Sequence, residues 1–233
     1  AGLADWSAQL ANGAEGSQVA YGFIFSTEYK EKHTSNAEFA TMLYHTMMDR
    51  EPDEAGLTDW VDKLNYTNTR EYVFNGFLFS TEFLRRCAAS GINIGNAIET
   101  PDATDAWQMN IQILALCNEQ RQNNGLEKLM TREDLWEQVA QVRAGEIVDY
   151  FSHIRPNGEN CFSLYEEAGL DYCTAGENIA GGQSGAPQVV NAWMNSETHR
   201  GNILEESYEY LATGYAAGGA YGTNYCQNFL GDW

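Results

Sequence analysis

The first hundred residues contain an internal repeat. Residues 2–29 and 56–83 align at an offset of 54 without a gap and share twelve identical residues, including Trp6 and Trp60. Units of a repeat protein bury their apolar faces against one another in a single packing scheme. We therefore expect residues 1–98 to form one compact, all-helical repeat domain.

The second copy indicates how a unit is built. Pro52 stands where a helix can begin, and a second helix is predicted after the polar break at residues 65–68. The apolar contacts of these two helices are expected from Leu57, Trp60, Val61, Leu64, Tyr72, Val73, Gly76, Phe77 and Phe83. By the same offset, the counterpart of residues 44–55 falls at positions −10 to 1. The first copy is therefore expected to be truncated, with more repeat sequence upstream.

These units resemble a bacterial extracellular repeat of unassigned function. The residues that carry the resemblance are REPDEAGL at 50–57, Trp60, and GFLFSTEF at 76–83, and the similarity covers roughly residues 1–90. The resemblance implies a helical module of exported proteins and no chemistry. A cell-surface or protein partner is the kind of interaction that such repeats would provide.

Charge and composition exclude several classes of function. The 33 acidic and 13 basic residues give a net charge of −20, a poor balance for neutralising phosphates, so we expect no nucleic-acid partner. No stretch approaches the ~20 apolar residues that span a bilayer, so we expect no transmembrane segment. The five cysteines lack the CxxC spacing of a structural zinc site. Cys161 and Cys173 could close a short loop in an oxidising compartment.

A polar stretch separates the repeats from a second domain. Residues 92–104 contain Gly95 and Pro101 and break the helical periodicity, which places a linker at residues 99–104 and a second domain at residues 105–233. Two strand-like runs, at residues 210–215 and 224–229, flank a glycine-rich turn and predict a β-hairpin. Helices followed by late antiparallel strands indicate an α+β domain.

Three helices are predicted ahead of that hairpin. The first covers residues 111–121, the second follows a capping box at residues 131–134, and the third begins at Ala186. The second helix is expected to present one apolar face made of Leu135, Val139, Val142, Ile147 and Tyr150.

Three polar motifs lie between these elements. They are FSHIRPNG at residues 151–158, GENIA at 176–180 and AWMNSETHRGNIL at 192–204. We expect His153 to follow the second helix, Glu177 to lie in a glycine-bounded loop, and His199 to follow the third helix. Two imidazoles and a carboxylate are the ingredients of a metal site, or of a base with an orienting partner. Their spacing alone fits unrelated surface histidines equally well.

Taken in order, these motifs resemble the bacterial branch of the CAP superfamily, which comprises cysteine-rich secretory proteins, antigen 5 and pathogenesis-related proteins. The resemblance covers residues 105–233 and includes the LxxxNExR pattern at residues 114–121. It implies an α-β-α sandwich with a central antiparallel sheet and a large cleft. It also implies an extracellular protein, secreted or associated with the cell wall.

The resemblance also implies site residues. The family's cleft holds two histidines, which can bind a divalent metal such as zinc, and two acids. Carried over by motif, the candidate metal ligands are His153 and His199, and one acid is Glu177. The second acid would lie three residues beyond Trp193, where this chain has Ser196, with Glu197 next to it. Glu177 and Glu197 are therefore the candidate catalytic carboxylates, and the second of them is shifted by one residue.

Three functions remain open at this point. The first is an extracellular binding module that holds a small molecule, a lipid or a peptide in a cleft with a divalent metal. The second is a metal-dependent, peptidase-like hydrolase with Glu177 as general base. The third is a structural or adhesive scaffold. Two histidines make a thin ligand shell for a catalytic zinc, which usually has three protein ligands, and this places binding first.

Overall fold

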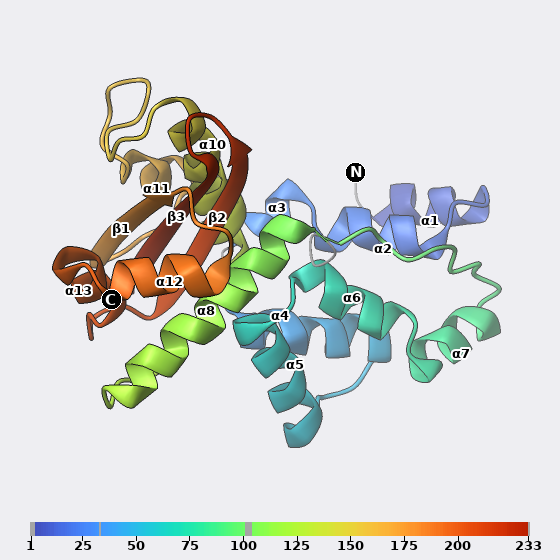
Figure 1. Ribbon diagram of the computed structural model, residues 1–233. Helices are drawn as coiled ribbons and strands as arrows, with labels where there is room; N and C mark the ends of the chain where they lie inside the picture. Colours follow the sequence, from blue (N-terminus) through green and yellow to red (C-terminus); the bar gives the residue numbers. More distant parts are fainter. Residues whose placement is uncertain (1–2, 33, 101–103, 233) are drawn as a thin grey trace. The chain divides into compact units, whose positions relative to one another are not determined.

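The chain folds as two units, one all-helical and one built around a β-sheet (Figure 1). A computed structural model describes residues 3–32, 34–100 and 104–232. The first unit is Ala1–Leu64 with Asn68–Pro101, and the second is Asn65–Thr67 with Asp102–Trp233. No helix in these described ranges combines the length and apolar character needed to cross a membrane.

The first unit consists of short helices. They are α1 (Leu3–Ala11), α2 (Gly16–Ile24), α3 (Thr27–Lys30), α4 (Asn36–Leu43), the π-helix η1 (Tyr44–Met48), α5 (Glu54–Tyr66), α6 (Arg70–Leu78) and α7 (Thr81–Ala89). The single helix expected to reach Phe83 is in fact two, because the Ser80 side chain accepts a hydrogen bond from the Phe83 amide and caps α7. Ser26 caps α3 in the same way. Tyr72, expected in the core, is 43% exposed.

Each copy of the repeated sequence places a tryptophan on a glycine. A Cβ added to Gly76 would lie 2.5 Å from the Trp60 indole, and one added to Gly22 would lie 3.0 Å from the Trp6 indole. The indole therefore rests on the helix backbone, and a larger residue at the glycine would displace it. In the second copy Phe77 packs against this indole with a ring-centroid separation of 5.2 Å.

The second unit places helices on both faces of an antiparallel sheet. Its elements are α8 (Asp105–Asn123), α9 (Glu133–Leu135), the π-helix η3 (Trp136–Ala140), α10 (Gln141–Asp149), α11 (Ser163–Glu167), β1 (Thr174–Gly181), α12 (Ala186–Met194), α13 (Glu197–Ile203), β2 (Tyr210–Gly218) and β3 (Gly222–Gly231). The strand order is β1-β3-β2, and β2 and β3 form the predicted hairpin.

The central strand β3 is buried on both faces, and its side chains alternate between two cores. Tyr225 and Phe229 pack with α8 and α12, whereas Cys226 faces α10 and Leu230 faces η3. Figure 1 shows α8 and α12 on one face of the sheet and α10 on the other. This arrangement confirms the predicted α+β class and the α-β-α sandwich.

The helix expected over residues 135–150 differs from the prediction in two respects. It begins at Glu133, and its N-cap residue, Arg132, makes no side-chain capping bond. The hydroxyl of the buried Thr131 accepts a hydrogen bond from Asn110 instead of capping the helix. Its π-helical turn η3 inserts an extra residue and rotates the positions that follow. Val142 and Tyr150 are consequently 40% and 48% exposed. Arg143, with no exposed area, takes the buried position instead.

Strand β2 requires a glycine at its closest approach to this helix. A Cβ on Gly214 would lie 1.9 Å from the Ala140 carbonyl oxygen, so Gly214→Ala should force the helix away from the sheet and lower the free energy of unfolding by about 3 kcal/mol. Gly145→Ala is the matched control, since a Cβ there meets no atom within 4 Å. The control should raise stability by up to ~1 kcal/mol through helix propensity. Urea denaturation measures both, and equal stabilities would contradict this packing.

Candidate functional site

His153 lies in the loop that follows α10, as predicted from its motif. The loop is shaped by a tight turn in which the Gly158 amide donates to the Arg155 carbonyl over 2.9 Å. Gly158 has φ +89°, a backbone conformation that residues with a Cβ atom rarely adopt. This explains the glycine at this position. The Cys161 amide donates to the carbonyl of His153 itself over 3.2 Å. The turn therefore fixes the backbone that carries the imidazole.

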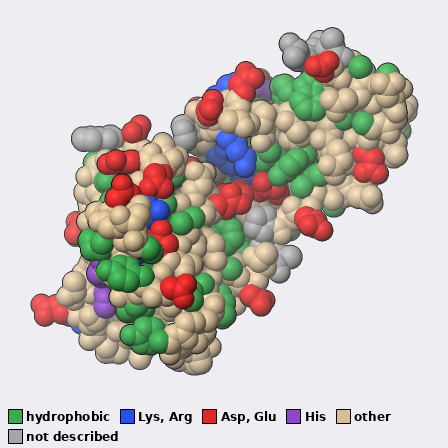
Figure 2. All heavy atoms as spheres, turned by 90° about the horizontal axis from the view of Figure 1, so that it is seen from above, with side chains coloured by type: hydrophobic (Ala, Val, Ile, Leu, Met, Phe, Trp, Pro, Cys, Tyr) green, Lys and Arg blue, Asp and Glu red, His purple; other side chains and the backbone are tan. Residues whose placement is uncertain are grey.

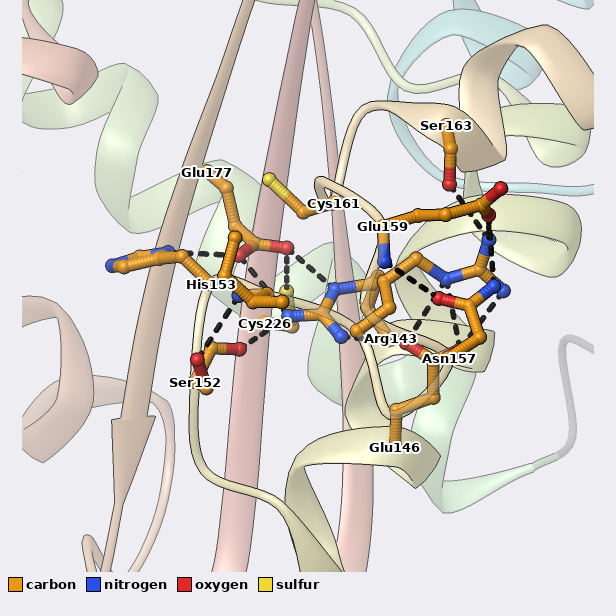
Figure 3. Close-up of polar contacts among 12 residues, drawn as sticks. Arg143, Glu146, Ser152, His153, Asn157, Glu159, Cys161, Ser163, Glu177 and Cys226 are labelled. Atoms are coloured by element: carbon orange, nitrogen blue, oxygen red, sulfur yellow. Dashed lines mark hydrogen bonds and ion pairs between the residues drawn. The ribbon is translucent and has the colours of Figure 1, made fainter.

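Glu177 lies in strand β1, and the expectation that it lies in a loop was wrong. It pairs with Asn228 of the central strand, and its side chain is 1% exposed. The His153 Nδ1 atom lies 2.8 Å from Glu177 Oε1 (Figure 3). The structure thus joins two of the predicted site residues in one hydrogen bond.

A third residue, Arg143 of α10, holds the same carboxylate. Arg143 Nε donates to Glu177 Oε2 over 2.8 Å, and Nη2 donates to Oε1 over 3.2 Å. Nη2 also donates to the carbonyl of Ser152, next to His153, over 2.7 Å. The sequence analysis missed Arg143. The sequence does hold a sign of it, because Arg143 lies four residues after Val139 and four before Ile147 and so shares their apolar helix face.

The ion pairs continue from Arg143 into the turn. Glu146 accepts from Arg143 Nη1 over 2.6 Å and from Arg155 Nη2 over 2.9 Å. Arg155 also pairs with Glu167 of α11. Arg155 therefore ties the loop that carries His153 to two helices, α10 and α11. Figure 3 shows Arg143 between Glu146 and Glu177 in this network.

Protonation states follow from these contacts. Burial alone would raise the pKa of Glu177, but hydrogen bonds from His153 and Arg143, together with the Arg143 charge, outweigh it and hold the pKa below its ordinary value. Burial and the nearby Glu177 charge raise the pKa of the Cys226 thiol well above its usual range. Cys226 therefore stays protonated, 3.3 Å from Glu177 Oε2. It is a donor to this carboxylate, which argues against a nucleophilic role.

His199 follows α12, as the sequence predicted, and lies within a further helix, α13, that the sequence did not predict. Its carbonyl accepts a hydrogen bond from Asn178 Nδ2 over 3.1 Å, and Asn202 donates to Asn178 Oδ1 over 2.8 Å. These bonds tie α13 to β1. Burial and the proximity of His153 lower the pKa of His199. The two imidazoles therefore lie within electrostatic range of each other, and the neutral form of His199 is favoured.

The shifted acid lies apart from this cluster. Glu197 is exposed in the first turn of α13, and Ser196 precedes it as an N-cap whose side chain makes no capping bond. Within the described residues, no hydrogen bond or ion pair joins Glu197 to Glu177, His153 or His199. Over the same part of the chain, no group of three or more His, Cys, Asp or Glu side chains is arranged to hold a metal ion.

The five cysteines are free thiols in the structure. Cys161 is buried while Cys173 is exposed, with its Sγ donating to the Asp232 carbonyl over 2.8 Å. The loop closure considered from the sequence is therefore not formed here. Cys117 is buried too, and burial raises its pKa to about 12, so it is an inert core thiol.

The site depends on the buried Arg143. Arg143→Met would leave Glu177 and Glu146 without their shared cation, so we expect a loss of about 3–5 kcal/mol in the free energy of unfolding. Arg200→Met is the matched control, because Arg200 is exposed and makes one hydrogen bond, to the Met194 carbonyl. It should stay within ~0.5 kcal/mol of the parent. Urea unfolding compares them, and an Arg143→Met protein as stable as the control would refute the network's importance.

Two curated proteins of Bacillus subtilis are similar in sequence to part of this chain. An uncharacterised protein of Bacillus subtilis (strain 168), YkwD, is 34% identical over 148 residues, which cover 63% of this chain and 55% of YkwD. The uncharacterised membrane protein YlbC of the same organism is 36% identical over 128 residues, covering 52% of this chain and 34% of YlbC. The chain thus spans about half, or less, of the curated relatives it matches.

Solved structures and family profiles identify both units. An extracellular protein containing an SCP domain from Bacillus anthracis str. Ames superposes with a TM-score of 0.50 at 30% identity, covering 59% of this chain and 45% of that protein. Residues 20–87 match a domain of unknown function, DUF4214. Residues 114–229 match the cysteine-rich secretory protein (CAP) family. This chain therefore carries a CAP domain of the cysteine-rich secretory protein family, preceded by a DUF4214 domain.

Proposed function

We propose that the CAP domain is an extracellular binding module whose centre is a divalent metal held by His153 and His199. The observation that carries this proposal is the hydrogen bond between His153 Nδ1 and the buried carboxylate of Glu177. Metal-binding histidines almost always donate their second ring N–H to a carboxylate or carbonyl, which fixes the tautomer and orients the ring. Glu177, itself held by Arg143, is suited to that role.

The donor set fits such a group. With Nδ1 engaged by Glu177, His153 has Nε2 available, and its side chain is 55% exposed. His199, whose pKa is lowered by burial and by His153, would supply a second, neutral imidazole. Imidazole nitrogens suit zinc, and two protein ligands leave positions for water or for a donor atom of a bound molecule. A metal held there would act as a Lewis acid toward that molecule.

Binding is favoured over hydrolysis by the state of Glu177. Both carboxylate oxygens already accept hydrogen bonds from Arg143, and His153 and Cys226 approach them as well. A general base needs a free lone pair and a pKa near the working pH, and Glu177 has neither. Among the described residues, Glu197 makes no hydrogen bond or ion pair with the groups around this carboxylate. The cluster is therefore arranged to orient an imidazole.

The surroundings of His153 indicate the chemistry of the bound molecule. Phe151, Ile154 and Tyr221 are 39%, 42% and 50% exposed, and the rings of Phe151 and Tyr221 are 4.7 Å apart. Figure 2 shows histidine side chains beside exposed hydrophobic side chains on this unit. A small molecule, lipid or peptide with an apolar part next to a metal-binding group would use both features.

The resemblance to the CAP family also supports an extracellular location. The Bacillus anthracis protein, which is similar over 59% of this chain, is described as extracellular. A surface with net charge −20 is compatible with export and disfavours direct adhesion to anionic wall polymers or lipids. The proposed ligand would then be met outside the cell or at its surface.

Zinc titration by calorimetry tests the centre. The parent protein should bind one zinc ion, and His153→Ala or His199→Ala should each weaken binding at least ~10-fold by removing one of two protein ligands. His45→Ala is the matched control, since His45 pairs with Glu51 in the DUF4214 domain and should leave the titration unchanged. If neither CAP-domain substitution changed the heat of zinc binding, the metal centre would be refuted.

Acid should release the metal. Ligating imidazoles must be neutral, so affinity is full where both histidines are deprotonated and falls as protons compete. The lowered pKa of His199 keeps that ligand neutral to a lower pH than a solvated imidazole with a pKa of ~6.5. We expect zinc affinity to be steady from pH 8 to 7 and to decline below about pH 6. Undiminished affinity at pH 5 would exclude a histidine site.

A further inference from the structure

An aromatic pair in the all-helical unit is left uncovered. Phe23 of α2 lies edge-to-face with Trp6 of α1 at a centroid separation of 6.4 Å. Phe23 is 56% exposed, the largest exposed fraction among the bulky apolar side chains of the described residues. We call the pair Trp6 and Phe23 the α1–α2 surface. Burying an exposed phenylalanine removes apolar surface from water, so an open face of this kind is suited to contact with a partner.

The second copy shows what covers the same pair. Phe77, the counterpart of Phe23 at the offset of 54, is 2% exposed. The ring of Tyr44, from η1, packs edge-to-face on it at a centroid separation of 4.9 Å. Tyr44 belongs to the continuous helical stretch of α4 and η1, which precedes α5 in the chain.

Local sequence does not explain the difference between the copies. Trp6, Gly22 and Phe23 are identical in type to Trp60, Gly76 and Phe77, and in both copies the indole rests on the glycine. What the described part of the first copy lacks is a helix placed as α4 and η1 are in the second. The exposure of Phe23 therefore reflects a missing neighbour.

We propose that the α1–α2 surface is a docking site for the last helix of another repeat unit of the same kind, a helix with the sequence character of residues 36–48. Its aromatic side chain would cover Phe23 as Tyr44 covers Phe77. This inference is independent of the zinc centre, since it concerns the other domain.

A second copy of this chain is a poor occupant. Its own Tyr44 is already 5% exposed against Phe77. At the offset of 54 the next position of that kind is Ile98, in residues 92–100, which form no helix. Ile98 is tied back to α6, where its amide donates to Asn75 Oδ1 over 3.0 Å. The downstream end of the domain thus presents no equivalent helix.

A graft tests the proposal on the full chain. Residues 34–54 are copied directly ahead of Ala1, which recreates the junction of Glu54 with Ala55 because residue 1 is also alanine. The tethered helix has a high effective concentration at the α1–α2 surface. We expect amide hydrogen exchange in α2 to slow about ten-fold, because covering Phe23 stabilises that helix.

Variants identify the surface and the occupant. Phe23→Glu should abolish the ten-fold slowing in the grafted chain while leaving the ungrafted chain folded, since Phe23 is exposed there. Phe79→Glu is the matched control, because Phe79 is 40% exposed at the end of α6 and should retain the slowing. A graft whose tyrosine, copied from Tyr44, is alanine should lose most of it.

Two results would overturn the proposal. One is an exchange rate in α2 that the graft does not change, or changes equally with Phe23→Glu. The other is a concentration-dependent dimer of the ungrafted chain, seen by sedimentation and lost in Phe23→Glu, which would make a second copy the occupant. Neither outcome bears on the zinc titration.

Discussion

Burial of the Glu177 carboxylate beneath the sheet surface is possible only because the guanidinium of Arg143 is buried with it. Either charge alone would carry a desolvation penalty of several kcal/mol. Two parallel hydrogen bonds join them, at 2.8 and 3.2 Å, and Glu146 and the Ser152 carbonyl take up further guanidinium donors. The pair links helix α10 to strand β1, so the two layers of the CAP domain and the His153 loop share one electrostatic anchor.

The loop that carries His153 is held in place by ion pairs of the same network. Residues between α10 and α11 have few backbone bonds to regular elements, yet Arg155 ties them to Glu146 of α10 and to Glu167 of α11. Imidazole orientation is then set by Glu177, whose own position is set by β1. A site residue on a loop thereby acquires the positional accuracy of the sheet, which binding of a metal by only two protein ligands would require.

Strand periodicity predicted the hairpin, because it is a local signal. The sandwich and the placing of His153 and Glu177 in one cleft came from the resemblance to the CAP superfamily, which rests on the order of three motifs. Glu177 was misplaced in a loop because glycines flank it. In the structure those glycines serve a strand, since a Cβ on Gly176 would lie 2.3 Å from the Tyr208 hydroxyl and one on Gly181 would lie 2.8 Å from the Tyr221 ring. They make room for neighbouring aromatic rings, which only the folded chain brings close. Arg143 escaped prediction for a related reason: the η3 turn alters which residues face the sheet, and its extra residue has no clear sequence mark.

In the all-helical unit, local sequence determines how the helices pack but not which side chains are exposed. Trp6 and Phe23 have the same sequence context as Trp60 and Phe77, and the indole contacts the glycine in both copies, so helix-level packing is encoded locally. Exposure is not, because it changes from 56% at Phe23 to 2% at Phe77 according to whether a tyrosine from the preceding helix lies on the ring. The α1–α2 surface therefore presents one side of an interface, and the proposed helix would complete at Phe23 the contact that Tyr44 makes at Phe77.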